Sequence, residues 1–476
     1  MNILKKIIGW TLITTSFVFM STIALLATVT FLYPDLLTIG WYDEITESVR
    51  DLLKNTEIIY AVIDFFIIFF IISLFLYFAG KKIINKDFSV HTYIIVFLIF
   101  VLIGTSLQSY IISKKYAGLT IPFNGEENES NIPNQYKDIL DEYINNGSVG
   151  VQMAISTPEN QWITSSGFAD CDKTKKITND DLFMIGSVTK VYTAVAILKL
   201  YEDGKIQLDD EISDFLPQNI IKNIANGDKI TVRQLLNHTS GLKNYVYITY
   251  KGWEDGSIKY LSAEENIAYI YNLPADFEPG SAFNYSNSNY LLLGIILKNV
   301  TKEASAYDAI NQIILQPFDL NHTFADSEKK VNVEGCKIKE DTNNAYNVSS
   351  IDFNAVGGVD MTDGGMISNA KDVLIFFNLL VKGEILKPET FNLMQTWVTP
   401  EYPNVENRTQ YLGYGLGLTK IKTDNLTGIG HYGMVYSFNS LVYYFPEKET
   451  TIVILNNTHS PKIEGVHMGN NIYNKL

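Results

Sequence analysis

Cysteine and arginine are scarce in this chain of 476 residues, which contains two cysteines and three arginines. The sequence has no Cys-x-x-Cys pair and no His-Glu-x-x-His pattern, so it offers none of the common short motifs of a metal site. We therefore predict neither a metal nor another cofactor. The formal net charge of −15 and the lack of a basic patch argue against a protein that binds nucleic acid.

The two cysteines, Cys171 and Cys336, are far apart in the sequence. A location outside the cytoplasm would permit a disulfide between them. Such a bond also requires that the two Cα atoms approach to within about 7 Å, which sequence spacing does not determine. The sequence therefore leaves both a disulfide and two free thiols open.

Long apolar runs are concentrated in the first quarter of the chain, at residues 7–33, 58–79 and 93–112. Each run is near or above the roughly 20 residues that a helix needs to cross a bilayer. A secretory signal peptide has one short apolar core, so it does not explain all three runs. We predict a membrane region with three transmembrane helices at residues 1–112, followed by a polar linker at residues 113–133.

The lysines around these runs predict the orientation of the chain. Lysines precede the first run and separate the second from the third, whereas the segment between the first two runs is mainly acidic. Because positively charged loops stay in the cytoplasm, we expect a cytoplasmic amino terminus and an extracellular region after residue 112. Asp64 lies near the outer end of the second run. We expect it to be solvated there, although a carboxylate inside a membrane span is also a candidate functional group.

The region at residues 134–476 combines the periodicities of strands and helices. Val151, Met153 and Ile155 alternate with smaller or polar residues, which predicts a half-buried strand with residues 161–168 as its hairpin partner. Further strands are predicted near the carboxyl end, at residues 411–419, 440–445 and 451–455.

Helices are predicted between these two groups of strands. Apolar periodicity indicates helices at residues 187–204, 289–300 and 369–381, and capping-box patterns begin at Thr231 and Ser262. Strands at both ends with helices between them predict an α+β fold. Its sheet would combine amino- and carboxy-terminal strands.

Ser187 and Lys190 stand at the start of one of these helices. Residues three apart on a helix lie on the same face, so the lysine amine can lie close to the serine hydroxyl. A serine hydroxyl needs a neighbouring base to become a nucleophile, and a lysine can be that base if burial lowers its pKa. The alternative is a capped helix start with a solvated lysine, because the spacing alone is common.

Two further motifs follow in a fixed order, Tyr285-Ser286-Asn287 and His431-Tyr432-Gly433. Together with Ser187-Val188-Thr189-Lys190, they resemble the Ser-x-x-Lys, Tyr-x-Asn and Lys-Thr-Gly or His-x-Gly motifs of the serine β-lactamase and penicillin-binding-protein superfamily. The resemblance is to the class C β-lactamase-like branch and covers roughly residues 135–460. It implies a β-lactamase/DD-peptidase-like fold, in which helices flank an antiparallel sheet and a helical subdomain is added.

The resemblance implies a role for each matching residue. Ser187 would form an acyl-enzyme, and Lys190 and Tyr285 would share the transfer of its proton to the leaving group. Asn287 would hydrogen-bond Lys190 and the substrate amide. The oxyanion hole would use the backbone N–H groups of Ser187 and Met434, an arrangement that contributes strongly to acyl transfer.

His431 and Gly433 belong to the motif that departs most from the β-lactamase pattern. The lysine of Lys-Thr-Gly helps to hold a substrate carboxylate, whereas a histidine is mostly neutral at pH 7. We therefore expect weaker carboxylate recognition than in an efficient β-lactamase. Relatives with His-x-Gly include D-aminopeptidases and esterases, as the resemblance implies.

Three other features have less specific interpretations. His238, in a His-Thr-Ser-Gly-Leu run, is expected to hold a loop in place, with a catalytic role as the alternative. Gly364 and Gly365 are expected to be required by the backbone near the site. The tyrosine-rich segment at residues 243–260 either lines the substrate cleft or forms a packed loop.

These observations predict a membrane-anchored extracytoplasmic serine hydrolase of a Gram-positive bacterium. Its expected substrates are D-alanyl esters or peptides derived from the cell wall or from teichoic acids. The alternatives are a penicillin-binding receptor or scaffold, a low-activity β-lactamase, and a membrane protein whose hydrolase domain has decayed. The sequence favours neither an ester nor an amide, and it indicates no oligomeric state.

Overall fold

The computed structural model describes residues 132–325, 331–339, 344–356, 358–399, 409–467, 469 and 472–476. The predicted membrane region lies outside these residues, as does the predicted linker apart from its last two positions. In the described ranges, every helix is too short or too polar to cross a bilayer.

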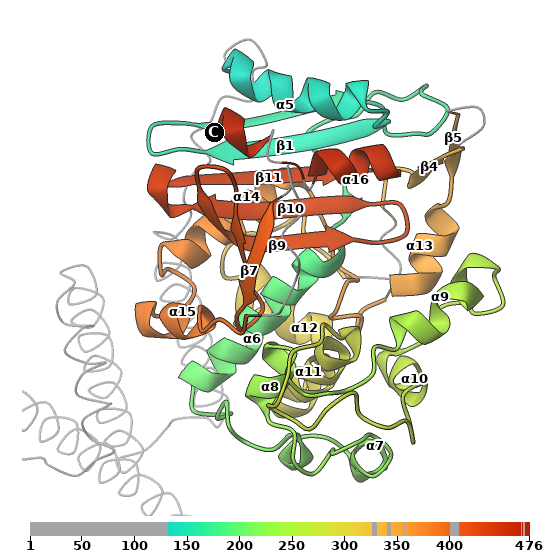
Figure 1. Ribbon diagram of the computed structural model, residues 1–476, viewed down its shortest axis with the longest axis vertical. Coiled ribbons are helices and arrows are strands. Elements are labelled where there is room, and N and C mark those ends of the chain that lie inside the picture. Colours follow the sequence, from blue (N-terminus) through green and yellow to red (C-terminus); the bar gives the residue numbers. More distant parts are fainter. Residues whose placement is uncertain are drawn as a thin grey trace, which may run out of the picture. The chain divides into compact units, whose positions relative to one another are not determined.

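A seven-stranded antiparallel sheet occupies the upper part of the domain in Figure 1, in the order β2-β1-β11-β10-β9-β8-β7. Its strands are β1 (Gly150–Ser156), β2 (Gln161–Gly167), β7 (Gln410–Tyr414), β8 (Thr419–Lys422), β9 (Thr427–Met434), β10 (Asn439–Phe445) and β11 (Thr450–Asn456). β1 pairs with β11, so that Val151 lies opposite Asn456. The predicted α+β fold, with one sheet built from both ends of the region, is confirmed.

Helices cover both faces of the sheet. Side chains of α5 (Asn134–Asn145) and α16 (Pro461–His467) form one core with β1 and β11. Side chains of α6 (Thr189–Glu202) and α14 (Ala370–Val381) contribute to the larger core on the other face.

The remaining elements are mostly short. Below the sheet in Figure 1 lie α7 (Gln218–Ile221), α8 (Val232–Leu236), α9 (Val246–Glu254), α10 (Ala263–Ala268), α11 (Asn287–Thr301) and α12 (Ala306–Ile310). The others are α13 (Ser349–Val356), α15 (Pro388–Met394), β3 (Phe183–Met184), β4 (Cys336–Ile338), β5 (Ala345–Asn347), β6 (Ile367–Ser368) and β12 (Thr458–His459). Both predicted capping boxes are present, at the starts of α8 and α10.

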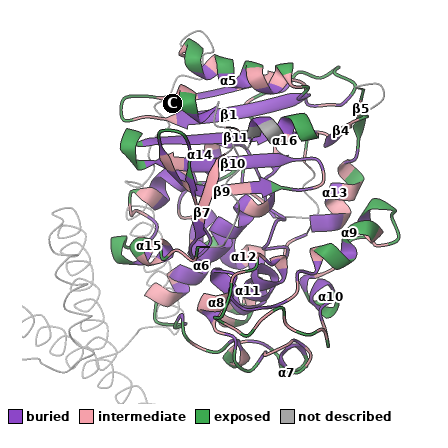
Figure 2. Cartoon of the chain, viewed as in Figure 1, coloured by how far each residue is buried: buried purple, intermediate pink, exposed green. Residues whose placement is uncertain are grey.

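The prediction that β1 is half-buried is wrong, because the strand is buried on both faces (Figure 2). Val151, Met153 and Ile155 face the core beneath α5, whereas Ala154 belongs to the larger core. Gln152 is also buried, and its side-chain amide is satisfied by three backbone groups. Small or polar residues at alternate positions therefore do not mark a solvent-exposed face here.

The strand predicted at residues 411–419 is two strands, β7 and β8, joined by a turn. Gly417 in this turn has a φ of +85°, which favours glycine. A Cβ added to Gly417 would lie 2.4 Å from the Cβ of Ala194. The turn therefore packs directly against α6, the helix that carries Lys190.

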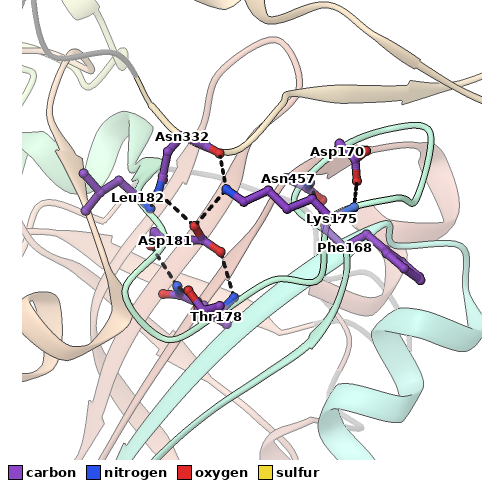
Figure 3. A network of polar contacts seen from close by, with 9 residues as sticks. Phe168, Asp170, Lys175, Thr178, Asp181, Leu182, Asn332 and Asn457 are labelled. Atoms are coloured by element: carbon purple, nitrogen blue, oxygen red, sulfur yellow. Dashed lines mark hydrogen bonds and ion pairs between the residues drawn. The ribbon is translucent and has the colours of Figure 1, made fainter.

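The segment between β2 and β3 is joined to the segment around β4. Cys171 and Cys336 form a disulfide, with their Cα atoms 5.7 Å apart. Figure 3 shows the nearby polar network, in which Asp181 accepts a 2.8 Å hydrogen bond from Asn332 and pairs with Lys175 at 3.5 Å. These contacts hold the segment that leads into β3 and from there to Ser187.

Candidate active site

Ser187 lies in η2 (Gly186–Val188), a single 3-10 turn immediately before α6. This turn packs against the end of β9 at two glycines. A Cβ added to Gly186 would lie 2.8 Å from the Met434 nitrogen, and one added to Gly433 would lie 2.9 Å from the Ser187 nitrogen. The glycines thus bring together the backbones of the two residues predicted to form the oxyanion hole.

Lys190 is the hydrogen-bonding centre of the site. Its Nζ donates to Ser187 Oγ at 3.1 Å, to Asn287 Oδ1 at 2.7 Å and to the backbone carbonyl of Asp363 at 2.5 Å. The side chain is fully buried. Burial lowers the pKa of Lys190 to about 7, although the nearby Asp363 carboxylate opposes this shift. At neutral pH a large fraction of the amine is therefore unprotonated and able to accept a proton.

Tyr285 approaches the Ser187 hydroxyl from the loop before α11. Its Oη donates to Ser187 Oγ at 2.8 Å, and Lys190 Nζ lies 4.9 Å from the centre of its ring. Burial raises the pKa of the Tyr285 phenol well above its usual value, despite the opposing effect of its hydrogen bond to Ser187. The phenol is therefore protonated at neutral pH, whereas Lys190 is the group able to act as a base.

His238 packs behind this tyrosine, and its backbone has a φ of +60°. The two ring centres are 4.3 Å apart. His238 Nδ1 accepts a 3.2 Å hydrogen bond from the backbone N–H of Ser286 and lies 3.0 Å from Asn289 Nδ2. Burial lowers the pKa of this histidine well below its usual value. Its contacts suit the expected structural role, because they hold the loop that carries Tyr285.

His431 lies in β9, with both ring nitrogens engaged by protein groups. Nδ1 lies 2.6 Å from the backbone carbonyl of Tyr432, and Nε2 lies 3.0 Å from Tyr414 Oη. Since a carbonyl only accepts, Nδ1 carries the proton and Nε2 accepts from the tyrosine. The side chain is 3% exposed, and burial together with Lys190 lowers the pKa of His431 to about 3. His431 is therefore neutral, and its ring N–H is already used within the protein.

A cavity of about 150 Å³ opens beside Ser187. Its walls come mainly from α9, α13 and the residues that follow β9, and most of them are apolar or aromatic. They include Val246, Tyr250, Trp253, Ile351, Ala355, Val356, Val435 and Tyr436. The segment at residues 243–260 therefore lines the cleft, one of its two expected roles, but does so as a helix. The α13 residues were missed, since a short apolar periodicity does not distinguish a cavity wall from core.

Asp363 also lines this cavity, and nothing in the sequence singles it out beyond its place before two glycines. Of those glycines, Gly365 is required, because an added Cβ would lie 2.5 Å from the carbonyl oxygen of Val356. The expectation for Gly364 is wrong, since the nearest atom to its Cβ would be 3.6 Å away.

In the part of the chain that the structure describes, no three His, Cys, Asp or Glu residues are grouped as a metal site would require.

The model of one protein family, described as Beta-lactamase, matches residues 136–469. Among curated proteins, Protein flp of Staphylococcus aureus (strain N315) is 26% identical over 314 residues, which cover 65% of this chain and 59% of that protein. Penicillin-binding protein 4* of Bacillus subtilis (strain 168) is 30% identical over 159 residues, covering 33% of this chain and 34% of that protein. The match thus spans less than two thirds of the length of either relative.

Solved structures with the same fold include enzymes. A D-stereospecific amidohydrolase from Streptomyces sp. is 28% identical, with a TM-score of 0.59 over 70% of this chain and 97% of that one. The D-amino acid amidase of Ochrobactrum anthropi SV3, complexed with L-phenylalanine amide, has a TM-score of 0.61 at 24% identity, over 72% of this chain and 95% of that one. At that identity the second likeness concerns the fold alone.

Proposed function

This chain belongs to the beta-lactamase family of serine hydrolases, and from that premise we propose that Ser187 forms an acyl-enzyme with D-alanyl esters or amides of the bacterial cell envelope. One observation carries the proposal: Ser187 Oγ lies between Lys190 Nζ at 3.1 Å and Tyr285 Oη at 2.8 Å. A hydroxyl within hydrogen-bond reach of both a base and an acid is what covalent acyl transfer requires.

Acylation begins with the neutral form of Lys190. Its amine accepts the Ser187 proton as Oγ attacks the substrate carbonyl carbon, and the resulting oxyanion is held by the backbone N–H groups of Ser187 and Met434. The bond between the acyl carbon and the leaving oxygen or nitrogen then breaks as Tyr285 gives its phenolic proton to the leaving alcohol or amine. The Lys190 ammonium returns a proton to Tyr285. Asn287 holds the lysine amine in position throughout, through its 2.7 Å contact.

Deacylation uses the same groups with water as the nucleophile. Lys190 accepts a proton from the attacking water, and the bond between the acyl carbon and Ser187 Oγ breaks. Tyr285 protonates the departing Oγ and is itself reprotonated by Lys190. The product is the free acid, and the resting state of the site is restored.

Separate observations support the acyl group and the location. A similar solved protein is named as a D-stereospecific amidohydrolase, which supports an acyl group of D configuration. The three apolar runs before residue 113 support anchoring in a membrane, with the active site outside the cell. The disulfide between Cys171 and Cys336 supports an oxidising compartment. Within the envelope, D-alanyl groups of teichoic acids or peptidoglycan would then be in reach.

The alternatives of a β-lactamase or a penicillin receptor are less well supported. Both require recognition of a substrate carboxylate, and the neutral, internally bonded His431 offers it neither charge nor a free N–H. We expect the full-length protein to hydrolyse benzylpenicillin at least about tenfold less efficiently than a D-alanyl ester, since a hydrogen bond to a charged group has about this effect. The reverse preference would favour the β-lactamase, and permanent penicillin labelling without ester turnover would favour the receptor.

The test of the proposed function is release of D-alanine from natural envelope material. Full-length protein is incubated separately with isolated cell walls and with purified teichoic acids, and free D-alanine is measured over time. Ser187→Ala should abolish release, whereas Ser213→Ala, which removes a partly exposed hydroxyl in another 3-10 turn, should not. Equal release by wild type and Ser187→Ala would contradict the proposal.

A further inference from the structure

Asp363 has a buried carboxylate oxygen with an unmet capacity for hydrogen bonding. The residue is 2% exposed. Its Oδ2 accepts a 2.9 Å hydrogen bond from Tyr245 Oη, whereas its buried Oδ1 has no hydrogen-bond partner among the described residues. Leaving such an oxygen buried and unpaired is costly.

A second buried aspartate, Asp352, has no unpaired carboxylate oxygen. Both oxygens of Asp352 accept hydrogen bonds from Ser437, one from the backbone N–H at 2.9 Å and one from the hydroxyl. Asp352 is not among the residues that line the cavity, but Asp363 is. The unpaired oxygen therefore belongs to the aspartate that lines the cavity.

Asp363 also lies at the right place relative to the nucleophile. Lys190 Nζ contacts both Ser187 Oγ and the backbone carbonyl of Asp363, so one amine separates the two residues. In an aminoacyl ester, the α-nitrogen is bonded to the carbon next to the carbonyl carbon that the serine attacks. A group that binds the α-ammonium must consequently line the cavity beside Ser187, as Asp363 does.

The rest of the cavity offers no competing anion. Asp363 is the one acidic residue among the described residues that line it, and the other walls are mainly apolar or aromatic. Burial raises the pKa of Asp363, while Lys190 opposes that shift. A substrate cation at Oδ1 would favour the ionised carboxylate in the same way, and the neutral form of Lys190 would not repel it.

We propose that Asp363 binds the free α-ammonium of the substrate, which makes the substrate class esters or amides of amino acids with an unblocked amino group. This inference rests on the proposed function and narrows the range of its substrates. A D-alanyl ester on a polyol has a free ammonium, whereas an internal D-alanyl residue of a peptide stem has its nitrogen in an amide bond. The first kind of substrate can therefore bind Asp363, and the second cannot make this contact.

Three methyl esters that share a leaving group test this proposal on the full-length protein: D-alanine methyl ester, N-acetyl-D-alanine methyl ester and methyl propanoate. Methanol release gives kcat/KM for each. The wild type should prefer the ester with the free ammonium over the other two by about 10- to 100-fold, the usual effect of a hydrogen bond between charged groups. Hydrolysis of all three without this preference would overturn the inference and leave the proposed function standing.

Variants then assign the preference to the carboxylate. Asp363→Asn should bring the ratio of the kcat/KM values close to one, and Asp363→Glu should keep part of the preference. Asp352→Asn is the matched control for loss of a buried carboxylate and should keep the full ratio. An equal loss on all three esters in Asp363→Asn would overturn the proposal. Failure of wild type to hydrolyse any ester would overturn both the proposed function and this inference.

Discussion

Lys190 Nζ lies 3.1 Å from Ser187 Oγ inside the protein, where burial brings the pKa of the amine to about 7. In the proposed mechanism, this pairing lets the serine hydroxyl become a nucleophile without a histidine base. Two histidines near the site, His431 and His238, are buried and engaged in other contacts, and burial lowers their pKa values, which makes them weak bases. The side chains that hydrogen-bond Ser187 Oγ are those of Lys190 and Tyr285. In the proposed mechanism, proton transfer at Ser187 therefore depends on the lysine and on Tyr285.

Replacing Lys190 tests its role as the base. Lys190→Arg keeps a cation but removes the group that can lose a proton near neutral pH. We expect kcat for D-alanine methyl ester to fall about 100- to 10,000-fold, the range typical of a general base. Lys199 lies on the same helix and pairs with Glu202 at 2.8 Å. Lys199→Ala is the control, and its kcat should stay within about twofold of the wild-type value. Similar losses in the two variants would contradict the assignment.

The pH dependence of kcat/KM follows from the same group. Only unprotonated Lys190 accepts the serine proton, so kcat/KM for methyl propanoate, an ester without an ionisable amine, should rise with pH through a single step near pH 7. Because burial raises the pKa of Tyr285 above its usual range, no loss of activity from phenol ionisation is expected below pH 10. Activity that falls on going from pH 6 to pH 8 would rule out this base.

Gly433 should be intolerant of a side chain. An added Cβ would lie 2.2 Å from the carbonyl oxygen of Ile185, so β9 would have to move away from η2. Gly433→Ala should lower the free energy of unfolding by about 1–3 kcal/mol, as over-packing does, and should also lower kcat by displacing Met434. Denaturant unfolding and steady-state kinetics measure the two effects. Gly364→Ala, which has space for the added carbon, is the control and should unfold like the wild type.

The disulfide should stabilise the domain without taking part in the chemistry. It joins Cys171 to Cys336, 165 residues apart in sequence, and so restricts the unfolded chain. The Cys171→Ser/Cys336→Ser double variant should lose about 2–5 kcal/mol of unfolding free energy. Its kcat at a temperature where it remains folded should match that of wild type. An unchanged unfolding curve would show that the bond is absent or has no effect on stability.

Local sequence patterns predicted the parts of the structure that depend on local interactions. The contact between Ser187 and Lys190 follows from two residues three apart at the start of a helix, and both capping boxes formed as expected. The sheet order could be anticipated only in outline. The alternation of large apolar residues with smaller or polar ones in β1 wrongly predicted one solvent-exposed face, because Gln152 and Ala154 face a second core instead of solvent.

Features of the site that depend on long-range contacts were harder to predict. Tyr285 lies 98 residues from Ser187 in sequence, and only a resemblance to known motifs brought the two together. The orientation of the His431 ring depends on Tyr414, a partner that no motif identifies. Asp363 was visible in the sequence only as the residue before two selected glycines, and the burial of one unpaired oxygen beside the cavity became apparent only in the structure.

The most direct test of the central claim is to identify the acylated residue during turnover. Full-length protein is mixed with D-alanine methyl ester, and the reaction is quenched in acid and analysed by peptide mass spectrometry. Ser187→Ala is treated in parallel. The wild type should carry a D-alanyl group on the peptide that contains Ser187, and the variant should carry none and should not hydrolyse the ester. An adduct on another residue, or ester hydrolysis by Ser187→Ala at the wild-type rate, would contradict the account.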